Sequence, residues 1–272
     1  MRTIAVIPAR FHSQRLPGKP LADLGGRPLV EHVYRRSAEA RLVDRVLVAT
    51  DDSRIQDAVT AFGGECVLTS PEHPTGTDRV AEAVADIEVD LVINVQGDEP
   101  FVEPQDIDQA VGACQSHETG PVIATLASPI TTAAEFWDPN AVKVVVDRRG
   151  FALYFSRSPI PFVATTQMSR DELRRRFDQG DDPVLGSCFK HVGLYVYPKR
   201  VLQTLTQTEP SPLERLEKLE QLRALENGIP IRVEITESAG IGIDTPADLE
   251  RARKLFRKLF SQAGDTACRS LE

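Results

Sequence analysis

Short apolar runs alternate with segments of helical periodicity through the first 126 residues. The run at 3–7 is closed by Pro8, and the run at 91–95 is apolar on both faces apart from Asn94. Between such runs, apolar residues recur every three or four positions, as on one face of a helix. The pattern predicts strands at 3–7, 46–49, 65–69, 91–95 and 121–126, and helices at 28–40, 55–62, 78–85 and 107–115. Strands that are apolar on both faces and alternate with helices indicate an α/β fold with a doubly wound, mostly parallel sheet.

The pattern changes after residue 130 to that of a smaller α+β subdomain. Segments at 141–147 and 151–155 flank the turn Arg148-Arg149-Gly150, which predicts a β-hairpin. Ser211 and Glu214 form the capping-box start of a helix expected over 211–227, with a leucine at every third position. This spacing spreads the apolar surface over a wide arc, which predicts contact with both the core and a partner subunit. The other expected elements are a polar excursion at 163–183, strands at 191–197 and 231–237, and a final helix from Thr245 that ends in a frayed tail.

The charge balance limits the classes of partner. The 272 residues include 32 Lys and Arg against 40 Asp and Glu, a net charge of −8. Binding to nucleic acid needs a basic footprint, so no nucleic-acid partner is expected. No apolar run reaches the roughly 20 residues of a membrane helix, and the first residues lack the pattern of a secretory signal. We therefore expect a cytoplasmic protein with no membrane partner.

The four cysteines are expected to be free thiols. None belongs to a CxxC pair, and none stands near a histidine at metal-ligand spacing. A zinc site and a disulfide framework are therefore not expected.

The first candidate site is the basic loop after the first strand, because ligands of doubly wound sheets bind beyond the carboxyl ends of the strands. Arg10, Arg15 and Lys19 lie within ten residues there. It is not a Walker A loop, since Ser13 stands in place of the first glycine and Pro20 follows the lysine. It also lacks the Rossmann fingerprint, which disfavours NAD. A solvated basic loop is the alternative, but three cations together favour a triphosphate site.

Two acidic residues are candidate ligands of Mg²⁺. Asp98 follows the strand at 91–95 beside Gly97, which allows close approach. An ordinary turn with a side-chain hydrogen bond explains Asp98 equally well. Asp244 precedes Thr245, which can cap the final helix by itself, so Asp244 is available as a second metal ligand or remains a turn residue.

Other segments could contact a ligand, and each has an ordinary alternative. The segment 75–77 places a glycine between two threonines, which suits either a base or ribose contact or a helix cap. His191 and Tyr195 share one face of the strand at 191–197, as on the floor of a polyol site or on a solvated face. Glu220 and Gln221 lie between the leucines of the helix at 211–227 and could reach a ligand or face solvent.

Seven segments, in order from about Arg2 to Arg253, are together similar to those of the 3-deoxy-manno-octulosonate (Kdo) cytidylyltransferases of Gram-negative bacteria. The segments are IPARFHSQRLPGKPLADLGGRPLVEHVY, HPTGTDR, NVQGDEP, NAVKVVVDRRGFALYFSRSPIP, KHVGLYVY, SPLERLEKLEQLR and GIGIDTPADLERAR. Sialic acid cytidylyltransferases share the opening IPAR, but RLPGKPL fits the Kdo branch better.

The resemblance implies roles for individual residues. Phosphates of CTP would be held by Arg10, Arg15 and Lys19, with Pro8, Ala9 and Ser13 lining the site. The surroundings of cytosine and ribose would be Thr75, Gly76, Arg79, Gln96 and Gly97. Mg²⁺ would be held by Asp98 and Asp244. Kdo would be bound by Arg157, His191, Tyr195, Glu220 and Gln221.

The resemblance also implies the reaction. The anomeric 2-hydroxyl of Kdo would attack the α-phosphorus of CTP in line, giving CMP-Kdo for lipopolysaccharide biosynthesis, and pyrophosphate. Catalysis would rest on Lys19, Arg10 and the Mg²⁺ at Asp98 and Asp244, with a second Mg²⁺ travelling with the β- and γ-phosphates. A homodimer is expected.

The expected organisation has four parts. They are a nucleotide-binding α/β region at 1–130, a sugar-binding and dimerisation subdomain at 131–240, a metal-ligand strand end with a returning helix at 241–260, and a tail at 261–272. Two other functions stay open at this point: a cytidylyltransferase for another acidic sugar, such as sialic acid or 8-amino-Kdo, and a non-catalytic nucleotide-binding module.

Overall fold

The computed structural model describes residues 1–12, 15–115, 122–164, 170–179, 184–238, 240 and 242–268. The chain divides into two compact units. The N-terminal unit comprises Thr3–Glu88, Asn94–Pro104 and Gly240–Glu272, and the central unit comprises Met1–Arg2, Val89–Ile93 and Gln105–Ala239.

A parallel sheet forms the centre of the N-terminal unit. Strand β1 (Thr3–Ala9) pairs with β4 (Arg45–Thr50), and β4 pairs with β5 (Cys66–Leu68), all in parallel. Four consecutive residues of β1, from Ile4 to Ile7, are fully buried, which requires cover on both faces of the strand. The carboxyl ends of β1, β4 and β5 therefore meet at one edge, where the sequence places its candidate loops.

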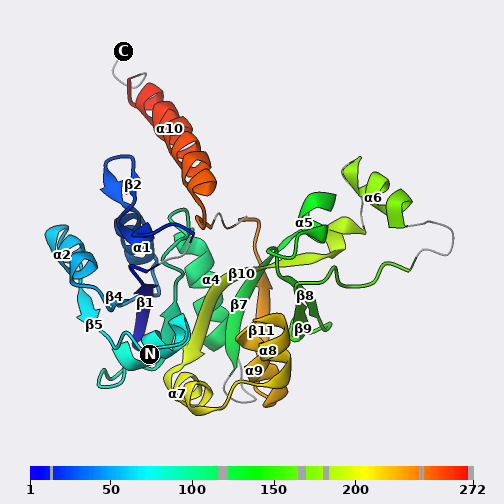
Figure 1. Cartoon of the computed structure of the whole chain (residues 1–272), viewed down its shortest axis with the longest axis horizontal. Helices are drawn as coiled ribbons and strands as arrows, with labels where there is room; N and C mark the ends of the chain where they lie inside the picture. The colour runs from blue at the N-terminus through cyan, green and yellow to red at the C-terminus, as the bar shows by residue number, and fades with distance from the viewer. Residues whose placement is uncertain are drawn as a thin grey trace. The chain divides into compact units, whose positions relative to one another are not determined.

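Helices α1, α2 and α3 cover this sheet. Contacts join α1 (Leu29–Ala38) to β1 and β4, α2 (Ser53–Ala61) to β4 and β5, and α3 (Gly76–Ala83) to β1 and β4 (Figure 1). Each helix lies where the hydrophobic periodicity predicts it, and each boundary differs from the prediction by only a few residues.

The last helix, α10 (Pro246–Cys268), packs on a small hairpin of β2 (Asp23–Leu24) and β3 (Arg27–Pro28). The hydroxyl of Thr245 accepts the Asp248 amide at 3.2 Å, so the predicted N-cap is confirmed. Drawn orange to red in Figure 1, α10 runs on to Cys268. The helix therefore includes residues 261–268 of the expected tail.

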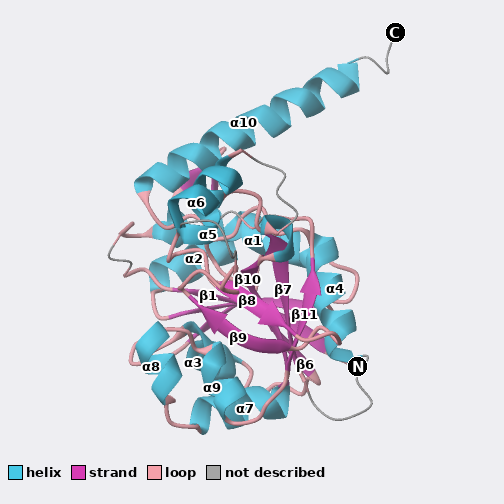
Figure 2. Ribbon diagram, turned by 90° about the vertical axis from the view of Figure 1, so that its right-hand side faces the viewer, coloured by secondary structure: helices cyan, strands magenta, loops and turns pink. Residues whose placement is uncertain are grey.

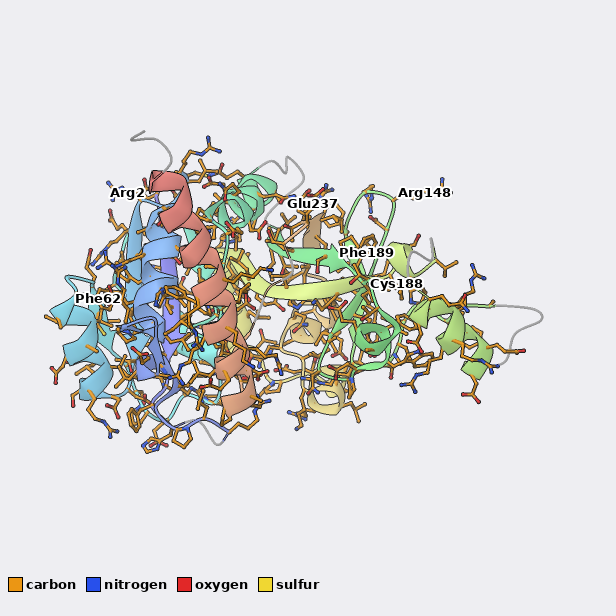
Figure 3. The ribbon with its side chains drawn as sticks, turned by 90° about the horizontal axis from the view of Figure 1, so that it is seen from above. Arg2, Phe62, Arg148, Cys188, Phe189 and Glu237 are labelled. Carbon is orange, nitrogen blue, oxygen red and sulfur yellow. The ribbon has the colours of Figure 1, made fainter. Side chains whose placement is uncertain are left out.

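In the central unit, β7 (Ile123–Pro129) lies between β10 (Phe189–Pro198), which is antiparallel to it, and β11 (Ile231–Ile235), which is parallel. The predicted hairpin is confirmed as β8 (Lys143–Val146) and β9 (Ala152–Ser156), and β8 also pairs with β10. Figure 2 shows these strands in magenta. Figure 3 labels Arg148 in the hairpin turn, and Cys188 and Phe189 where β10 begins.

Helices of the central unit are α4 (Pro104–Gln115), α5 (Ala133–Trp137), α6 (Arg170–Asp178) and α7 (Lys199–Gln207). The expected polar excursion at 163–183 contains the helix α6, which the sequence pattern did not predict. Leu173 and Phe177 of α6 are buried against Phe136 of α5, a contact that its charged surface residues obscure in the sequence.

The helix expected over 211–227 is broken in two. It forms α8 (Pro212–Glu217) and α9 (Gln221–Glu226), because Lys218 adopts the left-handed conformation, with φ 57°. The start is as predicted: the Glu214 carboxylate accepts the Ser211 amide at 3.1 Å. A non-glycine residue rarely takes this conformation, so the spacing of the leucines gave no warning of the break.

Strand β6 (Leu91–Asn94) crosses the division between the units, with residues 91–93 in the central unit and Asn94 in the N-terminal unit. The boundary expected at residue 130 does not coincide with this division, because β7 pairs with β10 and β11 of the central unit. The predicted fold class, a mostly parallel sheet flanked by helices, is confirmed. No helix in the described ranges combines the length and apolarity needed to cross a bilayer.

Candidate functional site

The basic loop after β1 folds back on itself in the N-terminal unit. The Gly18 amide donates to the carbonyl of Phe11 at 3.0 Å, and the Lys19 amide donates to the carbonyl of Leu16 at 3.1 Å. Gly18 has φ 67°, in the region that favours glycine. The turn returns the chain toward the end of β1 and fixes the position from which the Lys19 side chain extends.

Lys19 joins the two aspartates that the sequence singles out. Its Nζ lies 2.7 Å from Oδ2 of Asp98 and 3.1 Å from Oδ1 of Asp244. The other oxygen of Asp244, Oδ2, lies 3.1 Å from Nη2 of Arg15. Two carboxylates that are far apart in the chain thus converge on one ammonium group, beside a second cation of the same loop.

The surroundings of Lys19 act on its pKa in opposite directions. Burial by itself would lower this pKa, but the ion pairs with Asp98 and Asp244 outweigh burial and raise it above its ordinary value. Lys19 therefore remains a cation at neutral pH. The site maintains a permanent positive charge between its two carboxylates.

Backbone contacts place the Asp98 loop against the end of β1. The amide of Val95 donates to the carbonyl of Val6 at 3.0 Å. A Cβ on Gly97 would lie 2.8 Å from the carbonyl oxygen of Pro8, closer than two such atoms approach, so this position requires glycine. Packing of the loop on β1 therefore requires this glycine, while its predicted role in the close approach of a ligand stays a prediction.

A cavity of about 260 Å³ opens beside these groups. It is lined by Pro8, Ala9, Arg10, His12, Arg15, Lys19, Pro20, Gly76, Gln96, Gly97, Asp98 and Asp244. The structure thus brings together residues of four predicted segments at the carboxyl edge of the sheet. His12 and Pro20 were not predicted; their place in the basic loop was the available signal.

Arg10 lines this cavity and has one buried donor that is unsatisfied. Its Nη2 is buried and has no hydrogen-bond partner among the described residues. A buried guanidinium nitrogen without a partner is costly, so it is usually satisfied by a ligand or by water. This observation favours an anion as the occupant of the cavity.

Two described residues among the predicted nucleotide contacts, Thr75 and Arg79, are not part of the cavity lining. Ser13 lies outside the described residues. The Thr75 hydroxyl caps α3 by accepting the Asp78 amide at 3.2 Å, the ordinary alternative for that segment. Arg79 is fully buried and donates to Thr69 at 2.5 Å and to Asp51 at 2.9 Å, so its guanidinium is held within the protein. Binding roles for these residues stay predictions.

In the central unit, aromatic rings line one face of β10. His191 and Tyr195 have ring centroids 5.1 Å apart, and Tyr195 stacks on Tyr197 at 5.7 Å. Burial lowers the pKa of His191 to about 3, so its ring is neutral at pH 7. Burial, followed by Tyr197 and Glu220, raises the pKa of Tyr195 well above its ordinary value, so its hydroxyl keeps its proton.

The guanidinium of Arg157 is held by the break between α8 and α9. Its Nε donates to the carbonyl of Glu217 at 2.8 Å, and Nη2 donates to that of Lys218 at 3.3 Å. Nη1 donates to the carbonyl of Pro139 at 3.1 Å. Arginine has five N–H groups, so two remain for a ligand once these bonds to described residues are counted. The three acceptors of the guanidinium are neutral carbonyls, so its remaining N–H groups suit an anionic ligand.

Glu220 and Gln221 begin α9 immediately after this break. Gln221 is buried, and Glu220 is half-buried and close enough to Tyr195 to raise its pKa. Among the predicted sugar residues, the rings of His191 and Tyr195 lie close together, and the charge of Glu220 acts on Tyr195. Their roles toward a sugar stay predictions.

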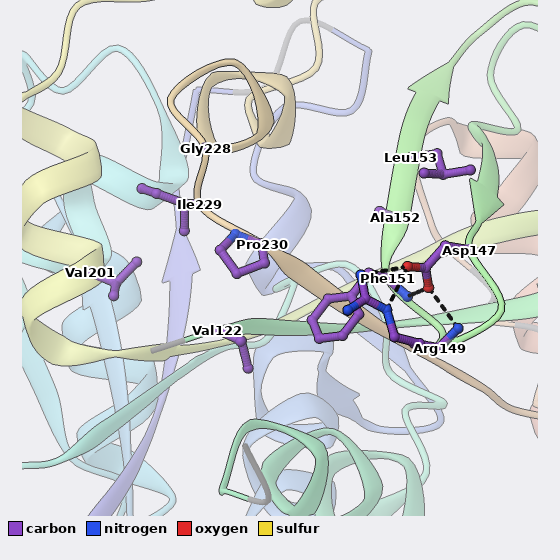
Figure 4. Close-up of a pocket in the computed structure, with 10 residues that line it drawn as sticks. All are labelled: Val122, Asp147, Arg149, Phe151, Ala152, Leu153, Val201, Gly228, Ile229 and Pro230. Carbon is purple, nitrogen blue, oxygen red and sulfur yellow. Dashed lines mark hydrogen bonds and ion pairs between the residues drawn. The ribbon is translucent and has the colours of Figure 1, made fainter. Parts of the chain in front are cut away.

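A second cavity, of about 580 Å³, lies elsewhere in the central unit (Figure 4). Its lining includes Val122, Phe151, Leu153, Val201 and Ile229. No predicted site residue is part of it. Its charged residues, Asp147 and Arg149, form an ion pair of 3.1 Å, and none of the described residues that line it has a buried side-chain nitrogen or oxygen without a hydrogen-bond partner.

The three cysteines whose side chains the structure describes belong to neither group of candidate site residues. Cys66, Cys114 and Cys188 are free thiols, as predicted, while the side chain of Cys268 lies outside the described residues. Burial raises the pKa of Cys66 to about 11 and that of Cys114 to about 12, so both thiols are unreactive at neutral pH. Among the described residues, no three His, Cys, Asp or Glu side chains gather as a metal site.

Comparison with known proteins defines the class. The cytidylyltransferase family model matches residues 4–235, and the chain belongs to this family. Among curated relatives, the 3-deoxy-manno-octulosonate cytidylyltransferase of Syntrophotalea carbinolica is 51% identical over 259 residues, covering 95% of this chain and 100% of the relative. That of Geobacter sulfurreducens is also 51% identical, covering 92% and 98%. The resemblance seen in the sequence segments is thereby confirmed.

Solved structures that are similar to this chain include members of the same class. CMP:2-keto-3-deoxy-manno-octonic acid synthetase, complexed with CTP, superposes with a TM-score of 0.84 at 43% identity, covering 95% of this chain and 99% of that one. The 4-diphosphocytidyl-2C-methyl-D-erythritol synthase of Anaerococcus prevotii matches with a TM-score of 0.59 at 14% identity, covering 94% of this chain and 98% of that one. The latter shows that the fold is shared.

Proposed function

We propose that this chain transfers CMP from CTP to Kdo and releases pyrophosphate. Full-length relatives at about half identity carry the name of this activity, and a structure at 43% identity is complexed with CTP. The observation in this chain that carries the proposal is the meeting of Asp98 and Asp244 around the Lys19 ammonium, beside the unsatisfied guanidinium nitrogen of Arg10.

The N-terminal unit would bind the nucleotide. Arg10, Arg15 and Lys19 line one cavity, and three cations suit the four negative charges of a triphosphate. As pyrophosphate leaves, negative charge grows on the oxygen that bridges the α- and β-phosphates. Cations that are already fixed in place stabilise this charge without further reorganisation.

The carboxylates of Asp98 and Asp244 fit Mg²⁺. Mg²⁺ is commonly held by one or two carboxylates together with substrate phosphates, and these two already face one cation, Lys19. When bound, Mg²⁺ would lower the pKa of the attacking hydroxyl and neutralise charge on the α-phosphate. Release of Lys19 from the carboxylates would free its ammonium for the phosphates. A second Mg²⁺ with the β- and γ-phosphates belongs to the same proposal.

The central unit would bind the sugar acid. The two remaining N–H groups of Arg157 suit the Kdo carboxylate, because a planar guanidinium can grip both oxygens. Tyr195, which keeps its proton, can donate to a sugar hydroxyl, and Glu220 can accept from one. Polar contacts of this kind discriminate strongly between substrates, because an analogue that lacks the matching group leaves them unpaired.

The chemistry is a single displacement at phosphorus. The 2-hydroxyl oxygen of Kdo forms a bond to the α-phosphorus of CTP, and the bond from that phosphorus to the bridging oxygen of the β-phosphate breaks. The hydroxyl proton passes to solvent, and pyrophosphate departs. Holding two anions in line accounts for much of the acceleration, because they otherwise repel one another.

Pyrophosphate release tests the proposal. Purified protein is incubated with CTP, UTP or ATP against Kdo, 8-amino-Kdo or sialic acid, with Mg²⁺ or with EDTA. We expect release with CTP, Kdo and Mg²⁺, and loss of release in EDTA. Faster release with sialic acid or 8-amino-Kdo than with Kdo would show that the proposed sugar substrate is wrong. No release with any combination of nucleotide and sugar acid would contradict catalysis.

We further propose a homodimer and a cytoplasmic location, where CTP is made and CMP-Kdo would supply lipopolysaccharide synthesis. Three large apolar side chains of the central unit support the dimer: Leu216 on α8 is 79% exposed, Phe162 88% and Leu153 63%. Multi-angle light scattering of the wild type and of Leu216→Arg tests it. We expect a dimer that the substitution weakens, whereas a monomeric wild type would contradict the proposal.

A further inference from the structure

A threonine, a histidine and two carbonyl groups meet where β10 bulges away from β7. Oγ1 of Thr125, which is fully buried on β7, lies 2.9 Å from Nε2 of His191. The same oxygen lies 2.7 Å from the carbonyl oxygen of Leu194 and 3.3 Å from that of Val192. Of the residues in this cluster, only His191 is among the site residues predicted from the sequence.

The bulge makes this meeting possible. Val192 pairs with Leu126, and Tyr195 pairs with the next residue, Thr125, so Gly193 and Leu194 are extra residues of β10. Two extra residues preserve the alternation of the strand, so His191 and Tyr195 stay on one face with Thr125. The carbonyl groups in the bulge turn toward Thr125.

Counting hydrogens decides which group donates. A threonine hydroxyl has one hydrogen, and a backbone carbonyl can only accept. The 2.7 Å between Oγ1 and the Leu194 oxygen is the usual length of an O–H···O bond, so the hydroxyl hydrogen points to Leu194. Oγ1 can then only accept from His191. The hydrogen between them must sit on Nε2, and a neutral ring leaves Nδ1 without one.

We infer that Thr125 is a positioning residue that holds His191 as the Nε2–H tautomer and so presents Nδ1 as a hydrogen-bond acceptor to a hydroxyl of the sugar. This inference rests on the proposed function. Nδ1 has no hydrogen-bond partner among the described residues, and the rings of Phe155 and Tyr195 flank the imidazole at 5.2 and 5.1 Å.

The tautomer determines what His191 can recognise. A bare ring nitrogen accepts from a hydroxyl but repels a carboxylate, so the carboxylate of the sugar is directed to Arg157. Burial, which lowers the pKa of His191 to about 3, keeps the ring from becoming a cation that would bind anions indiscriminately. His191 thus selects for a hydroxyl and Arg157 for the acid.

Nitrogen NMR of the ligand-free protein reads the tautomer directly. In a neutral imidazole, the protonated and unprotonated nitrogens resonate far apart, and the chain has only five histidines. The His191 signals are assigned by their loss in His191→Gln. We expect protonated Nε2 and unprotonated Nδ1 at pH 7. Protonated Nδ1, or a doubly protonated ring, would overturn the inference.

Kinetics of two threonine variants complete the test. Thr125→Val keeps the shape but removes the acceptor, so we expect Nδ1–H to become populated and the KM for Kdo to rise about tenfold, as for one lost hydrogen bond, with the KM for CTP unchanged. Thr125→Ser restores the hydroxyl and should match the wild type in both measurements. An unchanged tautomer and an unchanged KM in Thr125→Val would overturn the inference.

The two measurements distinguish failure of this inference from failure of the proposed function. If wild-type protein releases no pyrophosphate from CTP and Kdo, the function is wrong, yet the NMR signals still report the tautomer. If Thr125→Val does not fold, the wild-type spectrum and Thr125→Ser still decide the question: loss of the wild-type tautomer in Thr125→Ser would count against the assigned role of the hydroxyl.

Discussion

The backbone amide of Ile243 donates a hydrogen bond to the carbonyl of Asp98 at 2.9 Å. This contact ties the segment that precedes Asp244 to the loop that carries Asp98. As a result both carboxylates reach the Nζ of Lys19. The geometry of the acidic pair therefore rests on main-chain bonding as well as on the attraction of the side chains for a cation.

Asp98→Asn should lower the rate of pyrophosphate release by at least about 100-fold, the scale expected when a transition-state charge contact is removed. The melting temperature should change little, because the Asp98 side chain is partly exposed and Lys19 keeps Asp244 as a partner. Asp86→Asn, at an exposed position outside the cavity, is the matched control. Near wild-type rates in Asp98→Asn would remove this residue from the catalytic site.

Gly97→Ala should destabilise the N-terminal unit and displace Asp98, since the added Cβ would meet the Pro8 carbonyl at 2.8 Å. Gly112→Ala is the control: it lies within α4, nothing stands within 4 Å of its added Cβ, and alanine should stabilise the helix by about 0.5–1 kcal/mol. Thermal unfolding measures both. Equal melting temperatures for the two variants would contradict the packing argument.

Arg79→Ala should reduce the free energy of unfolding by about 3–5 kcal/mol, because it leaves Asp51 near-buried without its partner. Asp51→Ala should reduce the free energy of unfolding by a comparable amount, because it leaves the buried Arg79 guanidinium without its carboxylate partner. Urea denaturation of both variants measures this. If Arg79→Ala instead kept full stability and raised only the KM for CTP, the ion pair would be incidental and the binding role correct.

Arg157→Ala should raise the KM for Kdo by about 10- to 100-fold, as expected for loss of a charge-assisted hydrogen-bonded pair, and leave the KM for CTP nearly unchanged. Arg148→Ala, at an exposed arginine in the turn between β8 and β9, is the control. A similar rise for both substrates in Arg157→Ala would show that the residue supports the fold and does not bind the sugar acid.

Acid should destabilise the protein in part through His191. Burial depresses its folded pKa to about 3, whereas the unfolded ring has a pKa near 6.5. The unfolded chain therefore binds an extra proton between these values, and this contribution to stability is complete above pH 6.5 and declines as the pH falls toward 3, by up to about 1.4 kcal/mol per pH unit. Between pH 7 and pH 5, urea unfolding should show a larger loss in the wild type than in His191→Gln. Equal losses would argue against a buried neutral ring.

The sequence alone determined the order of strands and helices, because burial of both faces of a parallel strand forces runs such as 4–7 and 91–93 to be apolar throughout. It also determined the basic loop and the cap at Thr245, since each depends on residues only a few positions apart, whereas the steric need for glycine at 97 comes from the distant Pro8 carbonyl. The motif resemblance named the family for the same reason: short segments keep their residues in order.

Only the tertiary structure decided the remaining features. The break at Lys218, the burial of α6 and the ion pair of Arg79 with Asp51 depend on partners distant in the chain. The bulge that directs Thr125 to His191 is equally invisible, because alternation along β10 reads the same with or without two extra residues. Periodicity reports which face of an element is apolar, whereas the partner of a polar group is fixed by contacts that form only when distant segments pack.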